Sequence, residues 1–135
     1  MTLRRLVSSG SPYEPVVGFS RAVRAGDRVF VAGTVAVMPE GADPPADAGD
    51  QARRCLEIIG AALTEAGAAF EDVVRTRIYL VDTADFEAVG RAHGEVFGDI
   101  RPACTVVTVA ELVAPQYRVE IEADAAILLP PDAPA

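Results

Sequence analysis

Glu120 and Glu122 are the carboxylates with the most informative spacing in the sequence. Over residues 117–128 every second residue from Tyr117 to Ile127 is apolar, and the residues between them are charged up to Asp124, which is typical of a strand with one buried face. The two glutamates therefore share the polar face, roughly 6.6 Å apart at about 3.3 Å per residue. A partly buried glutamate with a moderately raised pKa can act as a general acid or base, so Glu120 is a candidate catalytic residue. The alternative is a solvated carboxylate on a strand face.

Arginine supplies every positively charged side chain, because all 12 basic residues are arginines. Arg75 and Arg77 alternate along a predicted strand and could neutralise the two glutamates across the sheet. Arg21 could place a positive charge in a ligand site, although a solvated arginine beside a hairpin is the alternative. The absence of lysine excludes Schiff-base catalysis through a lysine amine.

The two cysteines and the one histidine favour packing over catalysis. Cys104 would need a neighbouring cation, a helix N-terminus or a base to form a thiolate, and only Arg101 is close in sequence. We therefore favour Cys104 as a small residue that lines a cleft, and Cys55 as a core residue. His93 follows an apolar helical stripe without a carboxylate or nucleophile at a telling spacing, which favours a structural role.

The composition excludes several classes of partner and cofactor. A formal net charge of -8 opposes nucleic-acid binding, and no strongly basic patch compensates for it. A single histidine disfavours a zinc site, and no glycine-rich phosphate-binding pattern occurs, so we expect neither metal nor cofactor. No stretch of about twenty apolar residues is present, and the two cysteines form no CxxC pair. These features predict a soluble, cytoplasmic protein without a membrane partner.

The elements that must position these residues follow from hydrophobic periodicity and breaker residues. Apolar spacing of three and four predicts a helix that is capped by Asp50 and ends at Gly67, and another that begins at Asp82 or Thr83 and ends at Gly98. Residues 39–49 are rich in proline and glycine and predict a surface loop. The predicted strands cover residues 3–8, 16–24, 28–37, 73–81, 104–109 and 117–128.

This order, β-β-β-α-β-α-β-β, predicts one α+β domain over residues 1–128 and a frayed tail over residues 129–135. Two helices can cover only one face of the mixed sheet. Because residues 29–37 and 103–109 are apolar on both sides, we expect the uncovered face to pack against copies of the same chain. Closed cyclic symmetry is the usual arrangement.

Three motifs resemble the YjgF-like Rid (reactive intermediate deaminase) family. They are Phe19-Ser-Arg-Ala-Val23 before a Gly-Asp turn, Val29-Phe-Val-Ala-Gly-Thr34, and Arg101-Pro-Ala-Cys-Thr105 with Val119-Glu-Ile-Glu-Ala123. The match extends from about Phe19 to Ile127, and the third motif is the most specific.

The resemblance implies a homotrimer of chorismate-mutase-like subunits around a barrel-like core, with a cleft between each pair of neighbours. The best-known members hydrolyse imines of 2-keto acids to the keto acid and ammonia without metal or cofactor. By this resemblance Glu120 is the proton-transferring glutamate. The residues implied to bind substrate are Phe19, Arg21, Ala32, Gly33, Thr34, Ala103 and Cys104.

Two positions depart from the family scheme. Cys104 stands where an arginine after Pro-Ala would grip the substrate carboxylate, and a thiol has neither its charge nor its fork geometry. Phe19 replaces the usual tyrosine and lacks a hydroxyl. We therefore expect a small reactive imine, enamine or related carbonyl metabolite rather than a standard 2-imino acid. The alternative is a non-catalytic, small-molecule-binding or chaperone-like trimer; ribonuclease activity is disfavoured by the net charge.

Overall fold

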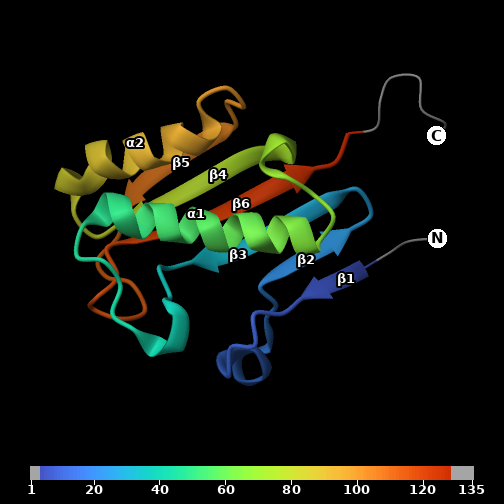
Figure 1. Ribbon diagram of the computed structural model, residues 1–135, viewed down its shortest axis with the longest axis horizontal. Helices are drawn as coiled ribbons and strands as arrows, with labels where there is room; N and C mark the ends of the chain where they lie inside the picture. Colours follow the sequence, from blue (N-terminus) through green and yellow to red (C-terminus); the bar gives the residue numbers. More distant parts are fainter. Residues whose placement is uncertain (1–3, 129–135) are drawn as a thin grey trace.

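The computed structural model describes residues 4–128, which form a six-stranded sheet with two long helices against it (Figure 1). The elements confirm the predicted order and the α+β class. The predicted tail, residues 129–135, lies outside the described residues. In chain order the elements are β1 (Arg4–Val7), β2 (Ala22–Ala25), β3 (Arg28–Thr34), α1 (Ala48–Glu65), β4 (Val73–Leu80), α2 (Phe86–Phe97), β5 (Ala103–Thr108) and β6 (Val119–Ala126).

The closing strand β6 lies inside the sheet, whose spatial order is β1-β2-β3-β6-β4-β5. Neighbouring strands are antiparallel except β4 and β5, which are parallel and are joined through α2. The glutamates of β6 are therefore flanked by β3 on one side and by β4 on the other. The short strand β1 and the strand β5 form the two edges.

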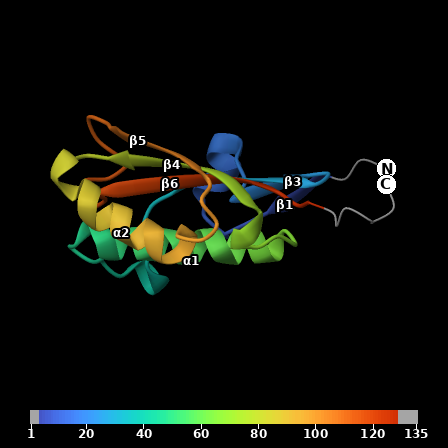
Figure 2. The ribbon, with the colours of Figure 1, turned by 90° about the horizontal axis from the view of Figure 1, so that it is seen from above.

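Both helices pack against the same face of the sheet, as predicted, and leave the other face open (Figure 2). Burial alternates along β6 and distinguishes its helix-facing side from its open side. The helix-facing residues Val119, Ile121, Ala123 and Ala125 are buried, whereas the residues between them are half-buried. The core forms between these strand residues and the apolar side of α1, including Cys55, Leu56, Ile59 and Leu63.

The segment before β2 is not the strand that the sequence predicts. Glu14–Gly18 forms one π-helical turn, and β2 begins only at Ala22. The carboxylate of Glu14 accepts hydrogen bonds from Ser8 Oγ at 2.8 Å and from Ser9 N at 2.9 Å, which folds this segment back on itself. Gly18 then takes a φ of +84°, a conformation that glycine adopts without strain.

The predicted cap of α1 is also corrected. Asp47, not Asp50, caps α1, because its Oδ2 accepts the Asp50 N–H at 3.0 Å. Val74 and Phe86 are apolar side chains that remain exposed. Val74 is 49% exposed at a register shift between Val73 and Arg75. Phe86 is 55% exposed at the first residue of α2.

Candidate functional site

Glu120 lies on the open side of the sheet, directly against the backbone of β3. A Cβ atom added to Gly33 would come within 2.5 Å of Glu120 Oε2, so the absence of a side chain at position 33 makes room for the carboxylate. Between Val31 and Thr34 the ladder advances three residues on β3 but only two on β6, from Ala123 to Ile121. This β-bulge changes the course of β3 beside Glu120, a placement that is common next to active sites.

The side chain of Arg21 donates hydrogen bonds to backbone carbonyl groups of this bulge. Its Nη2 donates to the carbonyl oxygens of Ala32, at 2.6 Å, and of Gly33, at 2.7 Å. The buried hydroxyl of Thr34 donates to the same Ala32 oxygen at 2.7 Å. The guanidinium of Arg21 lines a small pocket of about 200 Å³ together with Arg54 of α1.

The surroundings of Glu120 favour its protonated form. Burial raises the pKa of Glu120, the neighbouring charge of Glu122 raises it further, and the charge of Arg21 lowers it. A carboxyl group whose pKa is raised can donate a proton as well as accept one near neutral pH. The site is therefore electrostatically suited to acid–base chemistry.

Arg77, one of the two arginines predicted to neutralise the glutamates, forms ion pairs with Glu122 and Asp124 rather than with Glu120. Its Nη1 lies 3.8 Å from Glu122 and 3.5 Å from Asp124. Tyr79 donates its hydroxyl hydrogen to Glu122, and this bond raises the pKa of Tyr79. Arg75 forms no ion pair with any residue between positions 4 and 128.

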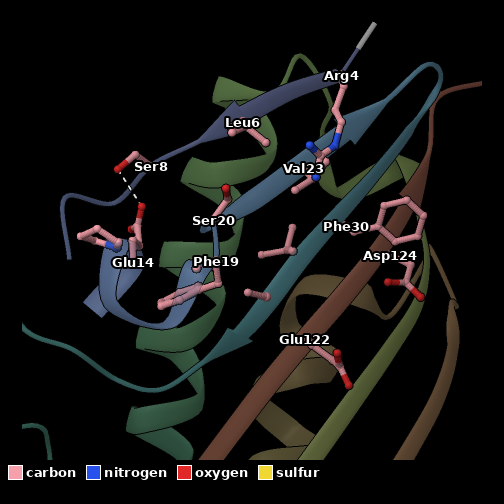
Figure 3. Close-up of a pocket in the computed structure, with 14 residues that line it drawn as sticks. Arg4, Leu6, Ser8, Glu14, Phe19, Ser20, Val23, Phe30, Glu122 and Asp124 are labelled. Atoms are coloured by element: carbon pink, nitrogen blue, oxygen red, sulfur yellow. Dashed lines mark hydrogen bonds between the residues drawn. The ribbon is translucent and has the colours of Figure 1, made fainter. Parts of the chain in front are cut away.

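A groove of about 820 Å³ occupies the open face beside this cluster (Figure 3). Phe19 and Ala32, both predicted to bind substrate, line it together with Phe30, Glu122 and Asp124. Phe19 comes from the segment after the π-helical turn, and its N–H donates to Glu14 O at 3.0 Å. The fold therefore brings Phe19, Ala32, Gly33, Thr34 and Glu120 to one region of the sheet.

Glu14 was missed by the sequence reasoning. Hydrogen bonds from Ser9 and Ser8 lower the pKa of Glu14 to about 2, so the carboxylate that positions the Phe19 segment stays ionised. The signal available in the sequence was two serines followed by an acid and a proline, a combination that favours local side-chain bonds to the backbone over a strand.

Cys104 and Ala103 lie away from Glu120 in the same chain. They open β5, which is separated from β6 by the whole of β4. Cys104 pairs with Thr76, which pairs with Ala123, whereas Glu120 pairs with Tyr79 further along β4. Both residues are exposed.

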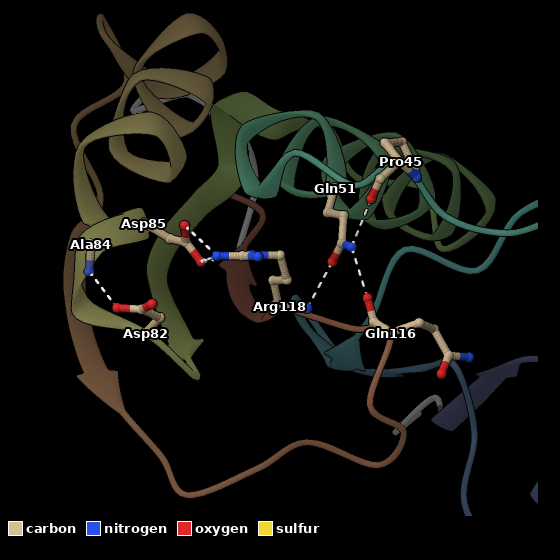
Figure 4. Close-up of polar contacts among 7 residues, drawn as sticks. All are labelled: Pro45, Gln51, Asp82, Ala84, Asp85, Gln116 and Arg118. Carbon is tan, nitrogen blue, oxygen red and sulfur yellow. Dashed lines mark hydrogen bonds and ion pairs between the residues drawn. The ribbon is translucent and has the colours of Figure 1, made fainter.

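The start of β6 is fixed by a buried polar network (Figure 4). Gln51 is 1% exposed; its Oε1 accepts the Arg118 N–H at 2.8 Å, and its Nε2 donates to Pro45 O and Gln116 O. The Arg118 guanidinium donates to both carboxylate oxygens of Asp85, at 2.9 and 3.0 Å. These contacts tie Arg118, two residues before Glu120, to α1 and to Asp85 at the N-cap of α2.

His93 and Cys55, for which the sequence favours structural roles, make structural contacts within residues 4–128. His93 Nε2 lies 2.9 Å from the buried Thr76 hydroxyl, and burial lowers the pKa of His93. Burial raises the pKa of the Cys55 thiol to about 12, which keeps it protonated. Residues 4–128 contain no cluster of three or more histidine, cysteine or acidic side chains placed to hold a metal ion, and no helix among them is long and apolar enough to cross a membrane.

Comparison with known proteins places the chain in a family. The model of the family described as Endoribonuclease L-PSP matches residues 10–127. An uncharacterized protein of Streptomyces coelicolor, SCO2049, is 40% identical over 121 residues, which cover 90% of each chain. The crystal structure of Rv2704 from Mycobacterium tuberculosis, described as a member of the YjgF/YER057c/UK114 family, has 47% sequence identity and a TM-score of 0.85 and covers 93% of this chain and 100% of its own.

A third relative carries a functional name. The Escherichia coli protein named "Putative reactive intermediate deaminase TdcF" is 31% identical over 108 residues, 78% of this chain and 83% of its own. The crystal structure of E. coli TdcF with bound serine has a TM-score of 0.75 at 29% identity and covers 90% of this chain and 93% of that one. The chain therefore belongs to the Endoribonuclease L-PSP or YjgF/YER057c/UK114 family, the Rid family that its motifs resemble.

Proposed function

We propose that this protein is a cofactor-independent Rid-type hydrolase that deaminates a small reactive imine, enamine or related carbonyl metabolite. The observation that carries the proposal is the half-buried carboxyl group of Glu120, which rests against Gly33 on the open face of the sheet. Burial and Glu122 raise its pKa, as a group that both gives and takes protons requires.

In this reaction water adds to the carbon of a C=N bond and the nitrogen leaves as ammonia. Glu120 takes a proton from the attacking water as the C–O bond forms and gives it to the nitrogen, which yields the carbinolamine. Glu120 then takes the proton of the carbinolamine hydroxyl and gives it to the amino group, so that the C–N bond breaks as the C=O bond forms. The products are the carbonyl compound and ammonia, and Glu120 returns to its starting state. No oxidant or reductant is consumed.

The clefts are proposed to lie between the subunits of a homotrimer. Ala103 and Cys104 are separated from Glu120 by β4 within one chain, and they reach such a site only from a neighbouring subunit. The open face also carries Leu6, 58% exposed, and Phe30, 46% exposed, which self-association would bury.

Substrate binding is proposed not to require a carboxylate on the substrate. The serine bound to TdcF carries a carboxylate, but here Cys104 stands at the family's carboxylate-binding position and offers no charge. Arg21 is engaged by the Ala32 and Gly33 oxygens. Imines and enamines without a carboxylate should therefore be hydrolysed at least as well as 2-imino acids.

The test compares wild-type protein with Glu120→Gln on matched imines with and without a carboxylate, with released ammonia as the readout. We expect a loss of at least about a hundredfold in kcat/KM, and Glu71→Gln, a change at an exposed surface glutamate, serves as the control. Because a base works only when ionised, the raised pKa of Glu120 should move the acid limb of the pH–rate profile above the ordinary glutamate value. Equal rates for wild type and Glu120→Gln would remove Glu120 from the mechanism.

A non-catalytic, small-molecule-binding or chaperone-like trimer is the second candidate, and Cys104 in place of the arginine favours it. It predicts that a metabolite raises the melting temperature without being consumed. Mass-spectrometric detection of consumption of that metabolite would contradict it.

A further inference from the structure

We infer that Arg21 is a positioning residue of the Glu120 site, because its guanidinium holds the Ala32–Gly33 bulge from the helix side of the sheet while Glu120 rests on the other side. The inference that Arg21 shapes the site stands on geometry, and only its effect on rate rests on the proposed function.

The position of the guanidinium separates it from the groove. Arg21 lines the pocket between β1 and α1 with Arg54 and Glu57, whereas the groove on the open face is lined by Phe19 and Ala32. Arg21 therefore contacts the bulge from the face of the sheet that the helices cover. It acts on a ligand through the backbone of β3 rather than by direct contact.

The bonding pattern explains why an arginine suits this place. A bulge removes carbonyl groups from the regular ladder, so these groups take their hydrogen bonds from other donors. One nitrogen of Arg21, Nη2, serves both Ala32 O and Gly33 O, while Arg21 O accepts the Ala32 N–H at 3.0 Å. The side chain of Arg21 thus bonds to both Ala32 and Gly33, and its backbone bonds to Ala32.

Burying the charged guanidinium of Arg21 costs free energy of folding. This cost indicates that the positive charge has a role at this position. Burial lowers the pKa of Arg21, and its Nε is buried with no hydrogen-bond partner in the described part of the chain. The nearby charges that oppose this effect come from Glu14 and Glu120. The guanidinium is therefore coupled electrostatically to the proposed acid–base residue and to the carboxylate that positions Phe19.

The titratable groups related to Glu120 come from several elements. Glu122 on β6 raises its pKa, Tyr79 occupies the paired position on β4, and the charge of Glu120 in turn raises the pKa of Cys55 on α1. Arg21 is the group that lowers the pKa of Glu120. Without this positive charge the carboxyl group would retain its proton to higher pH.

The test separates charge from geometry with three substitutions. Arg21→Met removes both the charge and the hydrogen bonds, Arg21→Gln keeps an amide donor near the carbonyls without the charge, and Arg21→Lys keeps the charge without the fork. Arg54→Gln is the matched control, because Arg54 lines the same pocket but bonds to Val37 O and Glu57 instead of the bulge.

The first readout is a ¹³C NMR titration of the Glu120 carboxyl carbon, assigned by its loss in Glu120→Gln. We expect the midpoint to move to higher pH in Arg21→Met and Arg21→Gln and to stay near wild type in Arg21→Lys and Arg54→Gln. An unchanged midpoint in folded Arg21→Met, which lacks both the charge and the hydrogen bonds, would overturn the inference. If Arg21→Met does not fold, unchanged midpoints in both Arg21→Gln and Arg21→Lys would overturn it instead.

The second readout is kcat/KM for ammonia release. We expect a fall of about tenfold or more in Arg21→Met, partial recovery in Arg21→Lys and no change in Arg54→Gln. Equal losses in Arg21→Met and Arg54→Gln would reduce Arg21 to a general stability role. If no substrate is turned over by the wild type, the proposed function fails, whereas the titration still decides the role of Arg21.

Discussion

At the scale of single residues, Gly33 is required for space rather than for backbone freedom. Its φ lies outside the left-handed region, unlike Gly18 or Gly26, so an alanine could adopt the same backbone conformation. The conflict is with Glu120 Oε2, the end of a flexible side chain that can move away. A methyl group at position 33 therefore displaces the carboxylate and leaves the fold in place.

We expect Gly33→Ala to lower kcat/KM at least about tenfold while its free energy of unfolding changes by about 1 kcal/mol or less. Urea unfolding and ammonia release measure the two effects. Gly90→Ala is the control, because a Cβ there meets nothing within 4 Å on an exposed part of α2. Its activity should stay unchanged and its stability should rise by about 0.5–1 kcal/mol. A Gly33→Ala protein with full activity would show that the carboxylate position does not matter.

The sequence predicted candidate site residues more readily than the contacts between them. Alternation along β6 and the family resemblance selected Glu120, and the structure places Gly33, Thr34 and Phe19 in its region. The hydrogen bonds from Arg21 to the carbonyl groups of β3 could not be predicted, because they depend on the position of a bulge that hydrophobic periodicity does not reveal. The separation of Cys104 from Glu120 needed the strand order, which hydrophobic periodicity does not encode.

At the scale of elements, the entry of the chain into β6 depends on one buried side chain. Gln51 of α1 bonds to three backbone groups that belong to the two loops flanking α1 and β6. Removing its amide leaves those groups without their partners, and each buried polar group without a partner is costly. The network thus couples the first turn of α1 to the position of Glu120.

We expect Gln51→Ala to lower the free energy of unfolding by about 2–3 kcal/mol, measured by urea unfolding at fixed subunit concentration. Gln116→Ala is the control, since Gln116 joins the network only through its backbone oxygen and is exposed. It should change stability by less than about 0.5 kcal/mol. Equal effects of the two substitutions would show that the amide of Gln51 carries no special role.

Elements with a strong repeat were predicted well, and short elements were not. The stripe of α1 and the alternation of β6 survive in the structure because each buries one continuous face. The π-helical turn at Glu14–Gly18 replaced a predicted strand because side-chain bonds from Ser8 and Ser9 outweigh the strand preference of two valines. The helix cap moved to Asp47 because both aspartates suit that role and only the loop geometry distinguishes them.

At the scale of the whole molecule, the sheet has one helical face and one open face. Residues 29–37 and 103–109 were expected to make the open face apolar. β6 presents Glu120, Glu122 and Asp124 to this face, beside apolar side chains from β1 and β3. Self-association on this face would therefore bury charges together with apolar groups. Charges buried in this way are stable only where they are paired, as Arg77 pairs two of them.

We expect Phe30→Arg to convert the proposed trimer into monomers at micromolar concentration, measured by sedimentation equilibrium. Phe30 pairs across the ladder with Asp124, so an arginine suits the isolated subunit while opposing its burial in an interface. Phe86→Arg is the control, because Phe86 is similarly exposed but lies on the helical layer. A wild-type protein that is already monomeric would remove the trimer and its clefts.

The contrast between the two thiols gives the molecule a natural attachment point for a reporter. Cys55 is a buried residue of α1, whereas Cys104 is exposed at the start of an edge strand. A maleimide dye should therefore label a single position without any engineered cysteine. Because the chain has no lysine, its side chains offer no competing amine. Fluorescence from that dye can follow ligand arrival and subunit exchange in the unmodified sequence.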